Sequence, residues 1–406
     1  MVAIANETLS LKFPKGKFDD FYLYDLTVTE GISELYRADA LVLSERLYTV
    51  EQLNEALSLE ATVTIAQRLE DGRTKRSRRL HGVVTEIEHD GVFYSSDKTD
   101  CFAYRLTIEP ELAALRHVVR KVSYNGKTPL DVVSELLADR GLTARFVEDY
   151  VSKRPFVSDC VYNQESSDFA FLKRLTAMYG LSFAFRHANA DSGRAELYFS
   201  SGECFPDNAE IAYSDGRVPA ATEEFDFRKS DESRNLWRMK SFSMKRRQGI
   251  DGVALIETYP DSNVGSDKWK AGAVGAGDRR RVYTRHFHNY VRAIPRDKVD
   301  ADVDLILRAK LRAFQIERDV WKGSADNLLL MPCKLFRLAR FYGGGNAATV
   351  SGMVTKSVLR CRAEWPQSMT MPPEARGETG RIEVAFEAMN RSDPANSRFC
   401  PFVPEE

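Results

Sequence analysis

Tyr162 to Phe185 read Tyr-Asn-Gln-Glu-Ser-Ser-Asp-Phe-Ala-Phe-Leu-Lys-Arg-Leu-Thr-Ala-Met-Tyr-Gly-Leu-Ser-Phe-Ala-Phe, which predicts one helix followed directly by one strand. Ser166 or Ser167 can accept hydrogen bonds from the first amides of the helix, and Asp168 complements the positive end of its dipole. Apolar residues then recur at helical spacing, at Phe169, Leu172, Leu175 and Met178 or Tyr179. One face of this helix is therefore expected to be buried.

Gly180 marks the point at which the apolar spacing changes from that of a helix to that of a strand. Glycine takes the left-handed backbone conformation that ends many helices. After it, the apolar residues at 181, 183 and 185 alternate with small ones, as in a half-buried strand. We therefore expect helix, glycine and strand to form one continuous unit.

The order of residues in this unit resembles the signature of hub proteins of contractile injection systems. That family comprises the type VI secretion spike proteins (VgrG) and the phage late-control or tail-hub proteins. The resemblance is carried by Tyr162, Glu165, Ser166, Asp168, Phe169, Phe171, Leu172, Arg174, Leu175, Gly180 and Phe183. The chain departs from the pattern at Ser167, one extra small residue, and at Ala177 to Tyr179, where acidic residues are usual. Neither departure disturbs the change from helix to strand.

The composition is that of a globular protein with room for more than one core. The 406 residues suffice for two or three domains, and 43% hydrophobic with 29% charged residues is typical of soluble domains. The formal net charge of -1 predicts no nucleic-acid partner. The start of the chain has neither the basic region nor the apolar core of a signal peptide, so none is expected, and no apolar stretch approaches the roughly 18 residues that insertion into a membrane needs. The six cysteines are scattered singly and are expected to be reduced and buried.

Residues 1–120 read as a succession of short strands, which predicts a small antiparallel barrel. Thr49 and Gln52 form a possible capping box for a short helix between two of them. Asp71-Gly72 and Asp90-Gly91 are predicted hairpin turns. The strands are expected over residues 18–28, 36–42, 61–66, 80–88 and 101–109.

Residues 121–225 change character and predict an α+β insert. Thr128 and Pro129 open a helix that Gly141 ends, and an extended segment follows at residues 142–147. The unit at 162–185 repeats this order of helix, glycine and strand. Residues 195–200 are expected to return as a hairpin strand beside residues 181–185.

Residues 226–396 return to strands and predict a second barrel with one long helix over residues 299–318. Residues 260–278 are rich in glycine, serine and aspartate and read as a long surface loop. The strands are expected over residues 236–244, 254–258, 281–293, 328–339, 347–362 and 381–390.

These segments together predict an α+β, mainly β fold, with two similar small antiparallel β-barrels and an α+β insert between them. The expected domains are residues 1–120, 121–225 and 226–396, followed by an extended exit linker over residues 397–406. The family resemblance implies the same order, because Gly82 to Val84 and Tyr104 to Leu115 match its first hub barrel. Leu330 to Ala339 resemble the stretch that follows the helix of its second barrel.

Candidate sites for metals and phosphates each lack a required part. His286 and His288 share one face of a predicted strand, but no third ligand is evident near them. Asp300, Asp302 and Asp304 imitate the start of a calcium loop without its glycine and glutamate, and an acidic first helical turn explains them. Gly343 to Gly345 precede a predicted strand where a phosphate loop needs a helix. We therefore expect no bound metal and no cofactor.

No recognisable order of catalytic residues occurs, so no catalytic residue is assigned. Spatial triads and paired carboxylates leave no trace in sequence and stay open. Basic clusters occur at Arg73 to Arg79, Lys245 to Arg247 and Arg279 to Arg281. The first lacks interleaved aromatic residues, which favours a solvated hairpin or a protein contact over nucleic-acid binding.

The resemblance implies a non-enzymatic structural hub that forms a homotrimer and adapts a hexameric tube to a three-fold spike. Other baseplate components are implied partners, and effector cargo is left open. Such a hub is assembled in the cytoplasm and delivered outward with its machine, which is a secretion system, a phage or a tailocin. Two further classes stay open, a baseplate-associated cell-wall hydrolase and a carbohydrate-binding β-module.

Phe399 to Pro404 resemble the linker that leaves the hub in this family. Members of the secretion-spike branch usually continue into a further barrel and a β-helical needle, whereas this chain stops at Glu406. We therefore expect a tube-facing hub, either a natural split form or a piece cut at the seam. A separate trimeric spike is expected to dock near Phe399 to Pro404.

Overall fold

Strands make up most of the molecule, as the alternating apolar residues require. The computed structural model describes residues 8–14, 17–68, 75–94, 98–125, 127–146, 160–163, 166–178, 180–187, 194–200, 222–226, 237–247, 252–257, 267–272, 282–286, 311, 313–314, 316–339, 350–366, 368–370 and 381–390. Within them, a large and mostly antiparallel sheet of 12 strands is accompanied by three small sheets. The prediction of a mainly β fold is confirmed.

The first half of the large sheet comes from strands that precede Pro110. Helix α1 (Val50–Asn54) lies between its third and fourth strands in the chain and begins at the predicted capping box of Thr49 and Gln52. A 3-10 helix, η2 (Glu111–His117), follows the last strand. The strands are β1 (Thr8–Lys12), β2 (Tyr22–Gly31), β3 (Arg37–Ser44), β4 (Glu60–Arg68), β5 (Lys75–Phe93) and β6 (Cys101–Glu109), and they pair in the order β1-β4-β5-β6-β3-β2.

The second half comes from strands after residue 221. They are β12 (Thr222–Asp226), β13 (Trp237–Arg246), β17 (Asp319–Ala325), β18 (Leu335–Ala339), β19 (Val350–Arg362) and β20 (Arg381–Asn390). They pair in the order β19-β18-β12-β13-β17-β20, and β20 pairs again with β19, so the pairings form a closed circuit. A separate small sheet holds β14 (Gly252–Glu257) between β15 (Asp267–Gly272) and β16 (Val282–His286).

The two halves share one strand order. When β1 to β6 are matched in sequence with β12, β13 and β17 to β20, every pair of neighbours in the first half has its counterpart in the second. Irregularities match as well, because β5 and β19 each carry a bulge, at Thr85 and at Thr355. Each threonine hydroxyl donates to a carbonyl of the next strand, Thr107 at 3.4 Å and Glu387 at 3.2 Å. The chain therefore contains a structural repeat that extends to single residues.

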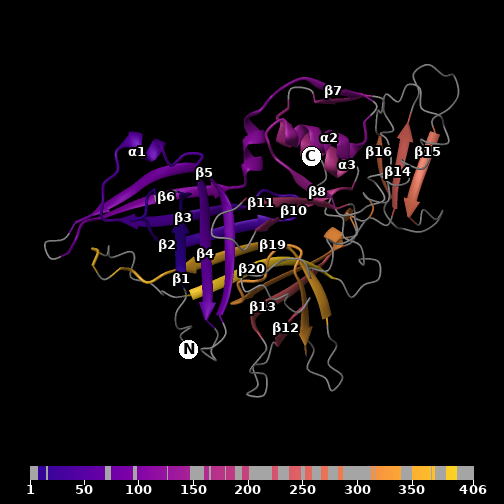
Figure 1. The fold of residues 1–406 in the computed structure, drawn as a ribbon. Helices are drawn as coiled ribbons and strands as arrows, with labels where there is room; N and C mark the ends of the chain where they lie inside the picture. The colour runs from indigo at the N-terminus through magenta and orange to yellow at the C-terminus, as the bar shows by residue number, and fades with distance from the viewer. Residues whose placement is uncertain are drawn as a thin grey trace.

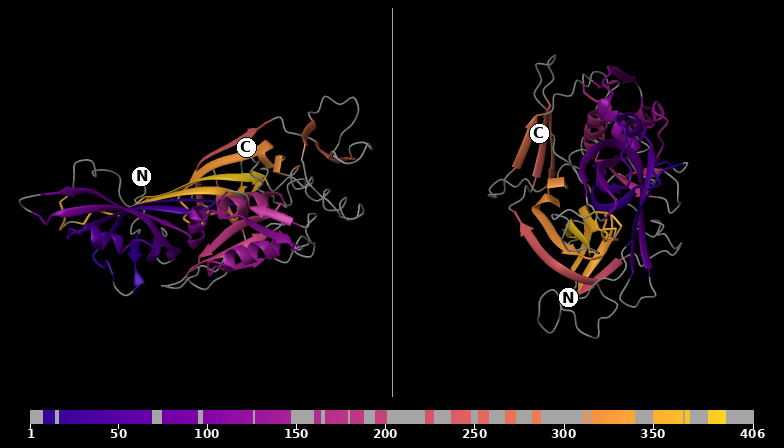
Figure 2. Two further views of the ribbon diagram at one scale, coloured as in Figure 1. Left: turned by 90° about the horizontal axis from the view of Figure 1, so that it is seen from above. Right: turned by 90° about the vertical axis from the view of Figure 1, so that its left-hand side faces the viewer.

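The halves are joined where β2 and β19 pair antiparallel, from Asp25 opposite Arg362 to Gly31 opposite Lys356. One hydrophobic cluster runs through both halves and includes fully buried Val28 from the first and Leu359 from the second. Figure 1 shows the halves side by side, the first in indigo to purple and the second in pink through orange to yellow, and Figure 2 shows them from two further sides. Edge pairing and a shared core make them one body.

The insert, defined here as residues 122–200, lies between the halves in the chain. Its helices α2 and α3 lie together on one side of β10 and β11 (Figure 1). It has a hydrophobic cluster of its own, which includes Leu136, Leu172 and Phe183. Its elements are β7 (Val122–Asn125), α2 (Pro129–Ala138), β8 (Ala144–Phe146), β9 (Cys160–Asn163), α3 (Asp168–Met178), β10 (Ser182–His187) and β11 (Ala195–Ser200).

The predicted unit of helix, glycine and strand is present in the insert. The Ser167 hydroxyl accepts from the Ala170 amide at 3.1 Å, so the helix cap is the second of the two candidate serines. Gly180 has φ of 67°, the left-handed conformation expected at the end of the helix. Strand β10 then pairs antiparallel with β11, as predicted. The earlier helix likewise begins at Thr128, with Pro129 in its first turn, and Gly141 with φ of 66° follows its end.

Asp90-Gly91 was wrongly predicted as a hairpin turn, because β5 runs through it to Phe93. The extra residue is absorbed as a bulge between His89 and Gly91. Arg105 on the neighbouring β6 binds the Asp90 carboxylate at 2.9 Å, which holds that side chain over the sheet. A turn signal inside a long strand here marks a bulge.

Other corrections concern the second half. Strand β15 lies within residues 260–278, which were predicted to be a loop, and β17 was not predicted at all. Of the strand predicted over residues 328–339, only Leu335–Ala339 is extended. The described residues among 311–318 are helical, whereas the rest of the predicted long helix, Asp71-Gly72 and the exit linker 397–406 lie outside the described residues.

Candidate functional site

The turn between β2 and β3 touches both the insert and the second half. The Ile32 amide donates to the Thr355 carbonyl at 2.9 Å, and the Ser33 amide donates to the Phe183 carbonyl at 2.8 Å. Ser33 has φ of 60°, the left-handed conformation that turns its amide toward the insert. One short turn therefore binds three parts of the chain together.

A small apolar cluster reinforces this contact. Ile32 packs with Cys333, Met353 and Met389 of the second half, and Tyr198 of β11 is packed against them.

Cys101, Cys333 and Cys361 are buried free thiols, as predicted, and burial raises the pKa of Cys101 to about 11. All three thiols contribute to packing as small apolar side chains.

Buried polar side chains lie between β5 and the insert. The Tyr36 hydroxyl donates to the His81 carbonyl, and the Tyr36 ring lies edge-on to Phe185, with centroids 5.1 Å apart. His187 of β10 accepts the His81 amide on Nδ1 at 3.1 Å, so its neutral form carries its proton on Nε2. The hydroxyl oxygen of Thr62 lies 3.1 Å from His81 Nδ1, within hydrogen-bonding distance. We call Tyr36, His81 and His187, together with Arg78 and Glu30, the polar joint.

Arg78 and Glu30 form a buried ion pair within the polar joint, with side-chain exposures of 4% and 9%. His187 Nε2 lies 3.9 Å from the same carboxylate. Burial lowers the pKa of His187 well below its ordinary value, and the charge of Arg78 and the His81 ring lower it further. His187 is therefore neutral at physiological pH, and Arg78 is the cation that balances Glu30.

Gly82 allows β5, β6 and the Tyr36 side chain to approach one another closely. A Cβ at this position would lie 2.7 Å from the Glu109 carbonyl and 2.8 Å from Ile108 Cγ2. It would also approach the Tyr36 hydroxyl to 3.1 Å. The family-like glycine predicted from the sequence is thus required by the close approach of β5, β6 and Tyr36.

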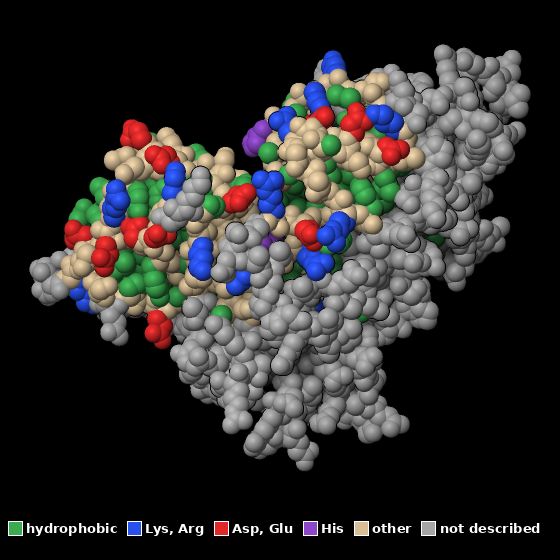
Figure 3. All heavy atoms as spheres, viewed as in Figure 1, with side chains coloured by type: hydrophobic (Ala, Val, Ile, Leu, Met, Phe, Trp, Pro, Cys, Tyr) green, Lys and Arg blue, Asp and Glu red, His purple; other side chains and the backbone are tan. Residues whose placement is uncertain are grey.

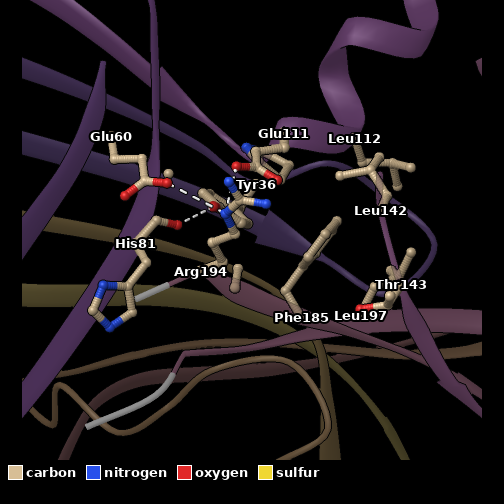
Figure 4. Close-up of a pocket in the computed structure, with 13 residues that line it drawn as sticks. Tyr36, Glu60, His81, Glu111, Leu112, Leu142, Thr143, Phe185, Arg194 and Leu197 are labelled. Atoms are coloured by element: carbon tan, nitrogen blue, oxygen red, sulfur yellow. Dashed lines mark hydrogen bonds and ion pairs between the residues drawn. The ribbon is translucent and has the colours of Figure 1, made fainter. Parts of the chain in front are cut away.

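A small pocket opens beside the polar joint, between β4, η2 and the start of β11 (Figure 4). Arg194 bridges two carboxylates there, Glu60 at 3.3 Å and Glu111 at 3.1 Å. Burial raises the pKa of Glu111, and the nearby Arg194 opposes that rise. The pocket encloses about 30 Å³, which is room for about two water molecules. Its polar groups bridge the insert to the first half, and its volume excludes a sugar ring.

The described part of the structure does not bring together the residues that the sequence offered as candidates for metal, phosphate or nucleic-acid binding. His286 ends β16, while His288, Asp300 to Asp304, Gly343 to Gly345 and Arg279 to Arg281 lie outside the described residues. Within the described ranges, no group of three His, Cys, Asp or Glu side chains is placed to hold a metal. Nor is any helix of those ranges long and apolar enough to cross a membrane.

The basic cluster Arg73 to Arg79 was wrongly interpreted as a solvated hairpin at Arg78, which is buried against Glu30. One signal in the sequence could have shown this. Arg78 alternates with Leu80 and Val84, both buried, so a strand places it on their face. Lys245 to Arg247, by contrast, are exposed at the end of β13. Figure 3 shows the described surface of one face with charges of both signs interspersed.

Comparison with known protein families defines the class of this protein. The model of the phage tail baseplate hub (GPD) family matches residues 29–358, which include the insert and most of the strands of both halves. The chain therefore belongs to the phage tail baseplate hub (GPD) family, and the resemblance seen in the sequence is confirmed. It is a VgrG-like hub component of the kind found in phage tails and type VI secretion systems, and the family is a structural one.

Individual relatives agree with this assignment. The type VI secretion system spike protein VgrG4b of Pseudomonas aeruginosa is 29% identical over 185 residues, which are 45% of this chain and 21% of VgrG4b. The chain thus spans about a fifth of the length of this relative.

Two solved structures show the same fold. The E. coli c3393 protein, described as a component of the type VI secretion system similar to the T4 tail proteins gp27 and gp5, matches with a TM-score of 0.58 and 15% identity over 97% of this chain and 80% of that one. The 43 kDa tail protein of prophage MuSo2 from Shewanella oneidensis matches with a TM-score of 0.58 and 10% identity over 97% and 100%.

Proposed function

We propose that this chain is a homotrimeric hub that adapts a hexameric tube to a three-fold spike. The observation that carries the proposal is the repeat, two halves with one strand order and matched bulges at Thr85 and Thr355. Three copies of a chain with two like halves present six like units around one axis. Such an assembly offers near six-fold symmetry to a tube while keeping three-fold symmetry for a spike.

Each half is proposed to act as one small antiparallel barrel. The closed circuit of pairings through β19, β18, β12, β13, β17 and β20 supports this in the second half, and β1 lies beside β2 in the first. We assign residues 1–120 and 226–396 to the two barrels, with β12 (Thr222–Asp226) added to the second, the residues between 121 and β12 to the insert and residues 397–406 to an exit linker. The shared core across β2 and β19 fixes the angle between the barrels.

The polar joint is proposed to hold the insert rigidly on the first barrel. The Ser33 and His81 amides donate to Phe183 and His187 of the insert, the Tyr36 ring packs edge-on against Phe185, and Arg194 adds two ion pairs. A hub transmits force from tube to spike, so its parts must not shift against one another. A rigid joint of directional bonds suits that task.

The partners proposed are a hexameric tube protein, a three-fold spike and further baseplate components, with effector cargo as an additional passenger. The hub is assembled in the cytoplasm and travels outward with the machine. We assign it no catalytic centre, no cofactor and no bound metal, because positioning and symmetry matching need only surfaces.

The proposal is tested by mixing the purified chain with a tube protein from the same genome and imaging the product by electron microscopy. We expect one trimer at one end of each tube, with density in six similar units. The chain alone and the tube alone are the controls. A hub bound along the tube wall, or tube ends that stay bare at saturating concentrations, contradicts the proposed function.

A further inference from the structure

The halves are joined by β2 of the first half and β19 of the second. Because the halves repeat, each of these strands has an equivalent strand in the other half. A row of paired residues crosses the first half through Leu26, Ala40, Leu106 and Ile87 on β2, β3, β6 and β5. The matching row crosses the second half through Phe242, Gly323, Phe386 and Ser357 on β13, β17, β20 and β19. Strand β13 therefore corresponds to β2, and β5 corresponds to β19.

Within the chain, β2 and β19 pair with each other, but their counterparts do not. Pairing of β5 with β4 ends at Val83, and in the described part of the chain no strand lies against that edge from Glu86 onward. Strand β12 pairs only with Trp237 and Arg238 of β13, and no described strand follows it along that edge toward Arg247. Within the described residues, each half thus presents one strand edge without a paired strand: β5 in the first half, the counterpart of β19, and β13 in the second half, the counterpart of β2.

The two open edges carry opposite charge. The edge of β5 holds Glu86, Glu88 and Asp90, and the end of β13 holds Lys245, Arg246 and Arg247. Glu88 and Lys245 are exposed, and the Glu86 side chain is 66% exposed. Surface strands with such charges are protected from non-specific pairing and accept only a complementary edge.

The register of β2 and β19 predicts which of these residues meet. In that pair, Val358 lies opposite Thr29, Leu359 opposite Val28 and Lys356 opposite Gly31. Transferred to β5 and β13, the same register places Glu88 opposite Lys245 and Glu86 opposite Arg247, both on the outer face. The buried pair of Leu359 and Val28 is replaced by His89 and Met244 on the inner face, where Met244 is 39% exposed in the single chain.

We propose that β13 of one copy pairs antiparallel with β5 of the next copy, with Glu88 opposite Lys245 and Glu86 opposite Arg247. The inference deepens the proposed function and rests on it, because three such contacts close a ring in which every barrel meets its neighbour through the same geometry. Around such a ring, contacts of two kinds alternate between neighbouring barrels. One kind is the pairing of β2 with β19 inside each chain, and the other is the proposed pairing of β13 with β5 between chains. The backbone bonds give affinity, and the charges select the register.

The direct test is a disulfide between chains in the full-length protein carrying Glu88→Cys and Lys245→Cys together. Directly opposed residues of antiparallel strands have Cβ atoms about 4.5–5.5 Å apart, close to the span of a disulfide. Mild oxidation is expected to give covalent dimers and trimers on a non-reducing gel. The matched control pairs Glu88→Cys with Met244→Cys, which project from opposite faces of the pair, and is expected to stay uncrosslinked.

A charge reversal tests the register independently of any disulfide. Glu88→Lys alone and Lys245→Glu alone are each expected to weaken the trimer about tenfold per interface, because like charges then face each other. The double variant restores the opposite pair and is expected to recover most of the loss. Both positions are exposed, so the single chains should keep their folded circular dichroism spectra.

The outcomes separate this inference from the proposed function. A trimer in light scattering that forms no disulfide between positions 88 and 245, and that ignores both charge reversals, overturns the strand pairing and leaves the trimeric hub standing. A chain that stays monomeric under all conditions overturns both. Crosslinked products that extend beyond three chains support the edge pairing and contradict closure of a three-membered ring.

Discussion

At the scale of single residues, the polar joint shows how charge is used inside a β-protein. Arg78 and Glu30 are nearly inaccessible to water, and each compensates the desolvation of the other. His187 contributes as a neutral acceptor for the His81 amide. Removing one member leaves a buried group without its counterpart, so the joint is expected to be sensitive to small changes.

Gly82→Ala is predicted to lower the free energy of unfolding by about 1–3 kcal/mol, because its Cβ would overlap the Glu109 carbonyl on a neighbouring strand. Denaturant unfolding followed by tryptophan fluorescence measures the loss. Gly91→Ala is the matched control on the same strand, where a Cβ meets only the Phe93 ring at 3.6 Å. Equal stabilities of the two variants would contradict the role given to Gly82.

Stability is predicted to fall as the pH is lowered below about 6.5, the ordinary pKa of histidine. The folded protein keeps His187 neutral because its pKa is depressed, whereas the unfolded chain takes up a proton, so acid favours unfolding until the pH reaches the folded pKa. The slope contributed by this one proton is about 1.4 kcal/mol per pH unit.

The measurement is a series of denaturant titrations between about pH 8 and pH 5, the range in which histidine ordinarily titrates. His187→Asn keeps an acceptor for the His81 amide and removes the titrating ring, so its stability should depend less on pH. His89→Asn, at an exposed site on β5, is the control and should retain the wild-type slope. A His187→Asn slope equal to wild type rules out this origin of the acid sensitivity.

At the scale of elements, the sequence predicted the strands whose own residues alternate. Strand β6 was predicted with its observed bounds, and α2 and α3 were found by their caps and ending glycines. Strand β17 was missed because it contains Gly323, which reads as a breaker. In the structure a Cβ at Gly323 would lie 2.6 Å from the Phe386 ring, so the glycine makes room for a side chain of β20. A sequence read alone does not reveal which distant ring needs that space.

Trp321→Ala is predicted to cost about 3–5 kcal/mol of stability, because it removes the largest fully buried side chain in the core of the described residues. Trp321 packs edge-on against Phe242 and Phe336, so its loss opens a cavity between strands of the second half. Thermal unfolding checks the prediction. Tyr94→Ala, at a side chain that is 71% exposed, is the control and should stay within about 0.5 kcal/mol of wild type.

At the scale of the whole molecule, the mainly β fold, the hub family and two similar β-rich halves were predicted from the sequence, but the shared strand order and matched bulges of the halves were not. Matched positions hold unlike residues, such as Ile87 and Ser357 or Ala40 and Gly323. Each residue packs against different neighbours in its own half, so the repeat leaves little similarity in the sequence. What repeats is the strand order and the position of the bulges. The polar joint was equally hidden, since it brings together three segments that are far apart in the chain: Glu30 with Tyr36, Arg78 with His81 on β5, and His187 on β10.

The central claim is that the repeat exists to build a three-membered ring with six like barrels. The mass of the full chain in solution tests it most directly, measured by light scattering at high protein concentration with and without tube protein. The account predicts a species of about three times the 46.0 kDa chain mass, either alone or once tube protein is added. A strict monomer at the highest concentration, in the presence and in the absence of tube protein, would contradict it.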